Sequence, residues 1–251
     1  MAAAVRREMD GSDVELPVPM HRVPMGMMLV RQGTITVDQL RAALEEQQQA
    51  RRDGSEARKL GTWLLESGVL SETALTRALS LQWNCPVLSL EGFRPGEMAP
   101  AMPRFLAEAF GALPVRTAGE RLLYLAFSGR VDRCLTYALG RITGLQVAAG
   151  IAPESEFRPA LEKYCAAAAP RVQFVETANS WALVRMIAER VESTRAAGAR
   201  LVRVHDIYWL RLWRRAPDKG GLPAPGRVED LLATVGTIAR NRDRTSDYRK
   251  I

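Results

Sequence analysis

The chain has 251 residues, of which 47% are hydrophobic and 25% are charged, a composition typical of a folded globular protein and not of a disordered one. Its net charge of +7 comes from residues 195–251, which hold 13 Lys and Arg against 6 Asp and Glu, whereas residues 1–194 hold 22 of each. Three widely spaced cysteines without a Cys-x-x-Cys pair indicate neither a disulfide framework nor a zinc site. No apolar run approaches the roughly 20 residues of a membrane helix, and no signal peptide is present, so a cytoplasmic location is expected.

A duplicated stretch follows a polar leader, residues 1–23, which is expected to be flexible. Residues 24–47 read PMGMMLVRQGTITVDQLRAALEEQ, and residues 59–82 read KLGTWLLESGVLSETALTRALSLQ. The two stretches align without a gap. Seven columns are identical: Gly26/Gly61, Leu29/Leu64, Gly33/Gly68, Leu40/Leu75, Ala43/Ala78, Leu44/Leu79 and Gln47/Gln82.

Each copy predicts a short helix (26–32 and 61–67), a glycine turn and a longer helix (37–51 and 72–83). Thr36 and Ser71 stand at N-cap positions, and the Thr36-x-x-Gln spacing has the form of a capping box. On each long helix two leucines and the closing glutamine share one face. A core shared by two units that cannot bury their apolar faces alone explains the leucines. A buried amide without partners costs about 1–3 kcal/mol, so two matched glutamines suggest a ligand that is itself two-fold.

Strand and helix alternate after the repeat at the spacing of a small α/β unit. The pattern predicts a boundary near residues 166–170. The elements expected before that boundary are strand 86–90, loop 91–103, helix 104–110, strands 112–117 and 121–128, helix 131–140, strand 146–149 and helix 154–168.

The last part of the chain predicts helix 180–197, a β-hairpin of strands 199–204 and 207–214, and a final helix 228–239 before a polar tail. Along the second hairpin strand, Trp209, Arg211 and Trp213 alternate with Tyr208, Leu210 and Leu212, so the two sets face opposite sides. The expected fold is therefore α+β. It consists of a tandem helical-hairpin repeat (24–90), a small α/β subdomain (91–168) and a basic helix, hairpin and helix segment (177–251).

Catalytic signatures are absent from the sequence. It contains no phosphate-binding loop, no dinucleotide-binding glycine fingerprint, no G-x-S-x-G elbow and no H-E-x-x-H helix. His21 and His205 lie in unrelated contexts, and the pair His205-Asp206 is expected to be a solvated turn. The sequence thus predicts a protein that is not an enzyme and has no metal site and no cofactor.

The repeated Leu-Gly, Gly, Leu, Leu and Gln positions resemble the N-terminal domain of type II secretion and type IV pilus assembly ATPases, the MshEN or GspE N-terminal family. ALPVRTAGERLLYLAFSG (112–129) and ALGRITGLQVAAGIAPESEFRPALEKY (138–164) resemble the α/β half of that domain. The resemblance covers about residues 24–165. It implies a regulatory or docking function, and because some members bind cyclic di-GMP, with one 24-residue motif for each half of the dinucleotide, it also implies a candidate ligand.

The resemblance also implies where such a ligand would lie. Helix starts favour phosphate, and glycines let the main chain approach it closely. The leucines would offer apolar surface to the purines, while the glutamines would bond base edges or hold the turn of the opposite element. The ligand-binding residues expected on this basis are Met25, Gly26, Leu40, Leu44, Gln47, Lys59, Leu60, Gly61, Leu75, Leu79 and Gln82.

The chain departs from the family pattern at the arginine that precedes Leu-Gly. The first copy has Pro24 there, and the second has Lys59, whose point charge cannot reproduce a guanidinium fork, although Arg58 is adjacent. Loss of a charge-assisted hydrogen bond costs about 1.5–3 kcal/mol. The first half-site is therefore expected to be impaired.

Three functions follow from these observations. The first is a non-catalytic regulatory or docking protein that binds a protein partner of a secretion or pilus machine. The sequence contains no P-loop motor. The partner would hold the chain at the inner membrane. The second is a cyclic di-GMP receptor that uses the same fold. The third is nucleic-acid binding through the basic C-terminus with Trp209 and Trp213, although these tryptophans alternate with leucines as ordinary strand residues do.

Overall fold

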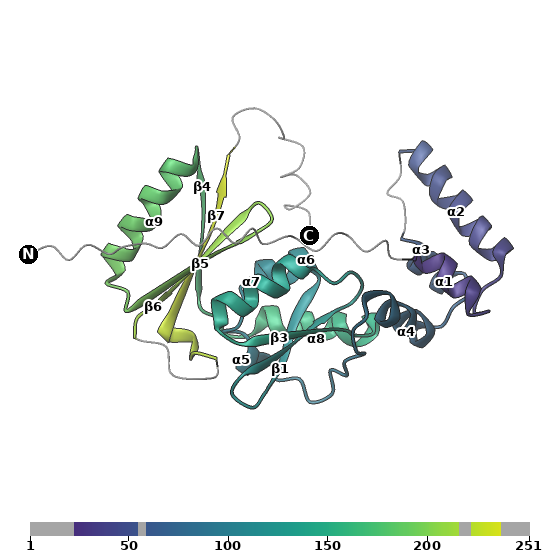
Figure 1. Ribbon diagram of the computed structural model, residues 1–251, viewed down its shortest axis with the longest axis horizontal. Coiled ribbons are helices and arrows are strands. Elements are labelled where there is room, and N and C mark those ends of the chain that lie inside the picture. The colour runs from purple at the N-terminus through teal and green to yellow at the C-terminus, as the bar shows by residue number, and fades with distance from the viewer. Residues whose placement is uncertain (1–22, 55–58, 216–221, 237–251) are drawn as a thin grey trace, which may run out of the picture.

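The computed structural model describes residues 23–54, 59–215 and 222–236. Three parts lie along its length (Figure 1): a helical unit at the right, an α/β unit in the centre, and a four-stranded sheet with one long helix at the left. The expected α+β class is confirmed. The predicted leader, Arg58 and the tail beyond residue 236 fall outside the described residues. Within the described ranges, no helix is both long and apolar enough to cross a membrane.

The helical unit contains the two sequence copies. The first forms α1 (Met25–Arg31) and α2 (Val37–Arg52), and the second forms α3 (Leu60–Glu66) and α4 (Glu72–Trp83). The capping box at the start of α2 is present: the Thr36 hydroxyl accepts from the Gln39 backbone N–H at 3.1 Å, and the Gln39 side chain accepts from the Thr36 N–H at 2.8 Å. Gly33 and Gly68 take φ values of +68° and +69° in the turns, a conformation that favours glycine. Local signals thus position all four helices.

A small separate core holds this unit together. Its buried members come from matched columns of the two copies: Leu29 and Leu64, Ile35 and Leu70, Ala43 and Ala78, together with Leu40. The packing is crosswise, since α1 contacts α4 and α3 contacts α2. The two copies therefore form one interlocked body and not two hairpins side by side.

The α/β unit has a three-stranded sheet of order β1-β2-β3. Strands β1 and β2 are antiparallel, and β3 joins β2 in parallel through α7. The expected strand at 86–90 is instead a single parallel bridge from Val87 to Ile151, beside the end of β3. The elements are α5 (Pro95–Met98), α6 (Arg104–Phe110), β1 (Ala112–Ala118), β2 (Leu122–Phe127), α7 (Arg133–Thr143), β3 (Gln146–Ile151) and α8 (Glu154–Ala166).

The third part is a sheet of order β4-β7-β6-β5, in which β4 and β7 are parallel and the other pairs are antiparallel. Helix α9 covers one of its faces through a core of Leu183, Leu210, Leu212, Leu231 and Ala233. The elements are β4 (Arg171–Thr177), α9 (Ser180–Thr194), β5 (Gly198–Val204), β6 (Ile207–Trp213), the 3-10 turn η1 (Pro225–Arg227) and β7 (Val228–Val235).

One expectation for this part is wrong. The segment expected as helix 228–239 is strand β7 over its described residues. Residues 171–177, for which no element was expected, form β4. Strand β7 is central, so residues on both of its faces are buried, Asp230 among them, and its sequence VEDLLATV lacks the apolar and polar alternation of a half-buried strand. The C-terminal sheet thus begins at Arg171, directly after the boundary expected near residues 166–170 and six residues before the segment 177–251 was expected to start.

The second face of this sheet packs against the α/β unit. Val204, Trp209 and Leu232 belong to the same large core as the β2 and α7 residues Leu125 and Leu139. Trp209 and Trp213 are buried, as is Arg211 between them. They are thus not available to stack on nucleic acid, and the third function loses the residues on which it depended.

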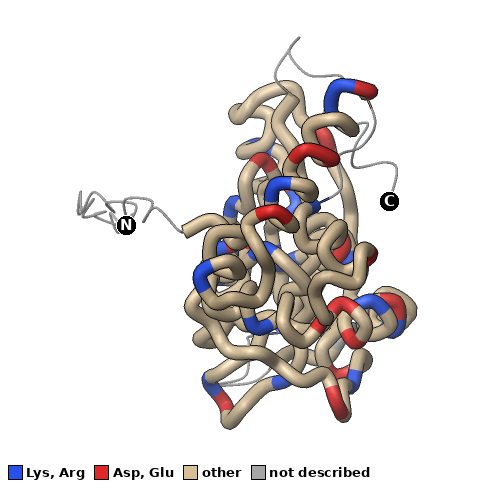
Figure 2. Tube along the Cα trace, turned by 90° about the vertical axis from the view of Figure 1, so that its right-hand side faces the viewer, with Lys and Arg blue, Asp and Glu red and all other residues tan. Residues whose placement is uncertain are grey.

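A buried ion pair lies in this contact. Arg211 Nε and Nη2 donate to the two carboxylate oxygens of Asp230, each at 2.8 Å, and Trp209 Nε1 donates to the same carboxylate at 2.8 Å. Arg211 Nη1 also donates to the Ala101 carbonyl at 3.3 Å, which joins the sheet to the α/β unit. Elsewhere, basic and acidic residues are intermingled along the trace in the view of Figure 2.

Candidate ligand site in the duplicated unit

Gly26 and Gly61, which occupy the same position in the two copies, are buried at helix crossings. A Cβ added at Gly26 would lie 2.5 Å from Leu40 Cδ1 of the same copy and 3.2 Å from Leu60 Cδ2 of the other. A Cβ at Gly61 would lie 3.0 Å from Leu75 Cδ1 and 3.5 Å from Met25 Cε. The relation is reciprocal, because residue 60 covers residue 26 and residue 25 covers residue 61. These glycines therefore have a packing role: they let each short helix sit against the leucine of its own long helix.

The four leucines of the expected site do not have equivalent surroundings. Leu40 is buried in the small core, and Leu75 packs against it. Leu44 has 42% of its surface exposed, whereas Leu79 packs against the large core of the α/β unit. Leu44 thus offers more apolar surface to a ligand than the partly buried Leu79, and the pseudo-symmetry is broken where α4 meets the rest of the protein.

The two glutamines also differ in their surroundings. Gln82 Nε2 donates to the Val23 carbonyl at 3.5 Å, a long contact to the residue before Pro24, the N-cap of α1. Gln82 thus reaches across to the entry turn of the other copy. Gln47 is half-buried near the middle of α2.

The residues that start the short helices carry the departure from the family pattern. Pro24 and Lys59 are both exposed, and both take extended backbone conformations as N-caps of α1 and α3 without a side-chain cap. Lys59 has its ammonium in solvent, while Pro24 supplies no charge and no donor. The structure thus brings Met25, Gly26, Leu60 and Gly61 together at the crossing and leaves a single basic side chain, Lys59, among the expected site residues.

A contact that the sequence analysis missed attaches this unit to the α/β unit. The Glu72 carboxylate, in the first turn of α4, accepts from the Ser155 backbone N–H at 2.7 Å and from the Ser155 hydroxyl at 2.6 Å, at the start of α8. These hydrogen bonds from Ser155 lower the pKa of the Glu72 carboxyl below its ordinary value near 4.5. The partners are 83 residues apart, so no local signal marks them.

One group of side chains has the chemistry of a metal site. Asp132, Cys134 and His205 place a ligand atom each within 4.8 Å of one another. Each atom already has a protein partner: Asp132 caps α7 through the Leu135 N–H and meets His205 Nε2 at 2.8 Å, and Cys134 Sγ donates to a carbonyl at 3.7 Å. This group is therefore a hydrogen-bonded contact between the β5–β6 turn and the start of α7.

Comparison with known proteins locates the relationship. Residues 83–171 match a family model described as the MshEN domain. The type IV pilus assembly ATPase PilB of Myxococcus xanthus (strain DK1622) is 32% identical over 150 residues, which are 59% of this chain and 25% of PilB. The chain thus spans about a quarter of the length of this curated relative.

Two solved structures are similar to a little over half of the chain. A structure of MshE with cdg is 29% identical and covers 57% of this chain and 99% of its own, with a TM-score of 0.46. A structure of the N-terminal domain of XpsE is 18% identical and covers 56% and 92%, with a TM-score of 0.39.

The segment that matches the family model comprises the end of α4 and the whole α/β unit, and it stops where β4 begins. It includes both stretches outside the repeat, 112–129 and 138–164, that resemble the α/β half of the family domain. The resemblance is thereby confirmed: residues 83–171 match the MshEN domain, and the chain is similar to the type IV pilus assembly ATPase PilB over 150 residues.

Proposed function

We propose that the chain is a non-catalytic regulatory module that docks on a protein component of a type IV pilus or type II secretion machine. The observation that carries the proposal is the 32% identity to an assembly ATPase over 150 residues, together with the MshEN match. A domain shared with such a motor has surfaces suited to the same machine. The module would bind the surface of a partner protein and would catalyse no reaction.

Two titratable groups of the α/β unit are in states suited to packing. Burial raises the pKa of the Cys165 thiol to about 12, with a further contribution from Glu108, so this cysteine is not a thiolate nucleophile. Burial also raises the pKa of the Tyr164 hydroxyl, which donates to the Met102 carbonyl at 2.6 Å. Both groups are held protonated, in states suited to packing.

The docking proposal is tested with purified components. The chain is immobilised, and the assembly ATPase and the inner-membrane platform proteins of the same genome are passed over it one at a time. Saturable binding of one component, with a change in ATPase rate when that component is the motor, is the expected result. The docking function is wrong if none of the components binds at concentrations up to about 100 μM. Only complexes with a Kd weaker than this would escape detection.

A second candidate function is a cyclic di-GMP receptor. The reciprocal crossing of the two copies, with residue 60 over Gly26 and residue 25 over Gly61, favours it, because a pseudo-two-fold scaffold suits a two-fold dinucleotide. The exposed Leu44 and Lys59 would supply one apolar and one cationic contact. MshE, which has been solved with cdg, is the relative that motivates the ligand.

The receptor candidate predicts that binding is limited by Pro24. Titration calorimetry with cyclic di-GMP should give weak heat for the natural chain and none for Lys59→Ala or Gln82→Ala. The double change Pro24→Arg and Lys59→Arg supplies two planar charged donors and should raise affinity about ten- to a hundredfold. Lys163→Ala, an exposed lysine on α8, is the matched control and should leave the heat unchanged. Equal heat from all of these proteins would rule out this site.

A further inference from the structure

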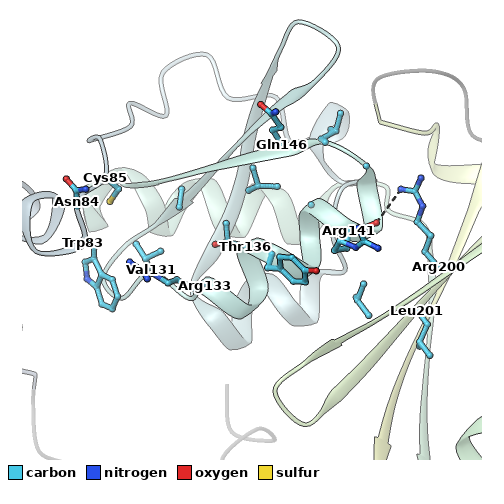
Figure 3. Close-up of a pocket in the computed structure, with 17 residues that line it drawn as sticks. Trp83, Asn84, Cys85, Val131, Arg133, Thr136, Arg141, Gln146, Arg200 and Leu201 are labelled. Atoms are coloured by element: carbon cyan, nitrogen blue, oxygen red, sulfur yellow. Dashed lines mark hydrogen bonds between the residues drawn. The ribbon is translucent and has the colours of Figure 1, made fainter. Parts of the chain in front are cut away.

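A groove of about 1040 Å³ runs along the outer face of α7, away from the crossing of the two copies. Figure 3 shows its two ends: Trp83, Asn84 and Cys85, at the end of α4, lie at one end, and Arg200 and Leu201, on β5, lie at the other. Its walls therefore come from all three parts of the protein. The shape is elongated, which distinguishes it from a compact pocket for a small molecule.

The charge of the groove has one sign. Its lining residues, all within the described chain, include Arg133, Arg141 and Arg200 and no Asp or Glu. Arg133, Tyr137 and Arg141 are spaced by four residues on α7, so they form one stripe, and Tyr137 has 71% of its surface exposed. Arg200 is held at the end of α7 by donating to the Ile142 carbonyl at 3.0 Å.

The two arginines on α7 are available to a partner. Among the described residues, neither Arg133 nor Arg141 forms an ion pair, and both are exposed. An exposed aromatic ring between two free guanidinium groups is a common composition for the centre of a protein interface. The stripe is therefore complementary in charge to an acidic partner.

The opposite wall of the groove is an open strand edge. Strand β3 is the last in its sheet. At the end of this strand, the Ile151 N–H donates to the Pro86 carbonyl at 2.9 Å, and the Ile151 carbonyl accepts from the Leu88 N–H at 2.7 Å. Because backbone groups alternate sides along a strand, Val147 and Ala149 present their N–H and C=O groups to the same edge. Both residues line the groove, and no described strand pairs with them there.

We propose that this groove binds an extended acidic segment of a protein partner, which adds as a strand to the open edge of β3 at Val147 and Ala149. Acidic side chains of the segment would meet Arg133, Arg141 and Arg200. Strand addition supplies backbone hydrogen bonds, and the flanking arginines supply the selection for charge. The chain's own residues 86–88, bridged to Ile151, already use the next position on this edge in the same way.

A small anion would use the arginines without the strand edge, so the two occupants can be separated by experiment. The probe is a fluorescein-labelled heptapeptide of alternating valine and glutamate, used with the full chain. We expect saturable binding, weakened by salt, and slower exchange of the Val147 and Ala149 amides measured by NMR. The amides of Gln146 and Ala148, on the β2 side of the strand, should not change. A peptide methylated on alternate backbone nitrogens should bind at least about tenfold more weakly.

The charge is tested by the double variant Arg133→Glu and Arg141→Glu, which should lower peptide affinity by at least about tenfold. Arg185→Glu, on exposed α9, is the matched control and should bind the peptide as the natural chain does. Three results would overturn the proposal: no binding of the acidic peptide, equal binding of the methylated peptide, or displacement by pyrophosphate with no amide protection, which would identify a small-anion site.

This inference rests on the proposed docking function, since it names the chemistry of the partner, yet the two fail differently. If a machine component binds the double variant as well as the natural chain, docking stands and the groove is not its site. If the peptide binds as described but no machine component does, the groove stands and the proposed function falls.

Discussion

Arg211 and Asp230 are charged side chains withdrawn from water, each with an exposed side-chain fraction of 1% or less. Removing ions from water costs several kcal/mol each unless they are paired and fully hydrogen-bonded, as they are here with Trp209 and the Ala101 carbonyl. The pairing depends on the β6–β7 register, which places Arg211 opposite Asp230. The sequence could not predict it, because residue 230 was expected on a helix.

Replacing Asp230 with alanine should therefore destabilise the protein strongly. The change leaves the Arg211 charge buried without its partner, and the expected loss in free energy of unfolding is about 3–5 kcal/mol, measured by urea denaturation. Glu189→Ala removes an exposed ion pair with Arg185 on α9 and should cost less than about 0.5 kcal/mol. Similar losses in the two variants would contradict a special role for the buried pair.

Gly150 is a second position where a single atom decides the packing. A Cβ there would lie 2.8 Å from the Pro86 carbonyl oxygen and 2.5 Å from Leu88 Cγ, and the carbonyl belongs to backbone that cannot rotate away. Gly150→Ala should cost about 1–3 kcal/mol in unfolding free energy and accelerate exchange of the Leu88 amide. Gly129→Ala, with nothing within 4 Å, is the control. An unchanged Leu88 amide would show that the bridge to β3 does not depend on this glycine.

At the scale of elements, the sequence predicted those whose signals are local. Helices α1 to α4 follow from caps, glycine turns and leucine spacing, and the structure reproduces them within two residues at each end. Strands β4 and β7 were missed because their neighbours are distant in sequence and β7 is buried on both faces. The same limit applies to the candidate site: the repeat predicted matched leucines, but contact with the α/β unit makes Leu79 differ from Leu44.

The contact between α4 and α8 should respond to pH. The pKa of the Glu72 carboxyl is lowered in the folded state, so its stabilisation is present above the unfolded value near 4.5 and is lost as pH falls through the folded value. Glu72→Gln should cost about 0.5–1 kcal/mol at pH 7, a modest figure because solvent screens this partly exposed group. The difference from the natural chain, measured by urea unfolding, should narrow below pH 4.5.

The control for this prediction is Glu162→Gln on α8, whose side chain is exposed and away from the α4 contact. Its unfolding free energy should follow that of the natural chain at every pH. A Glu72→Gln deficit that stays constant between pH 7 and the acid range would mean that hydrogen-bond shape, and not the carboxylate charge, holds the two helices together.

At the scale of the whole molecule, the duplicated unit has an apolar core separate from those of the rest of the protein. The duplicated unit has its own small core, whereas the large core is continuous from the α/β unit into the C-terminal sheet. Few apolar side chains join the two, and Leu79 and Trp83 at the end of α4 are among them. The duplicated unit should therefore open more easily than the remainder.

Native-state hydrogen exchange tests this order of stability. Amides of α1, α2 and α3 should exchange through openings of lower free energy than amides of β2, α7 and β6, and low urea should widen the difference. A ligand that binds only the duplicated unit should protect the first group selectively. Equal opening free energies across both groups would indicate one cooperative unit and contradict a separately stabilised duplicated unit.

The large core extends beyond the segment that matches the MshEN model. Val204, Trp209 and Leu232 belong to the core that contains residues of β2 and α7, yet they lie beyond residue 171, where the match to the MshEN model ends. A protein that ended at residue 171 would expose the apolar residues of β2 and α7 to water. Its Ala101 carbonyl would also lose the hydrogen bond from Arg211. The matched segment 83–171 is thus smaller than the part of the protein that shares this core, and a protein ending at residue 171 should be insoluble.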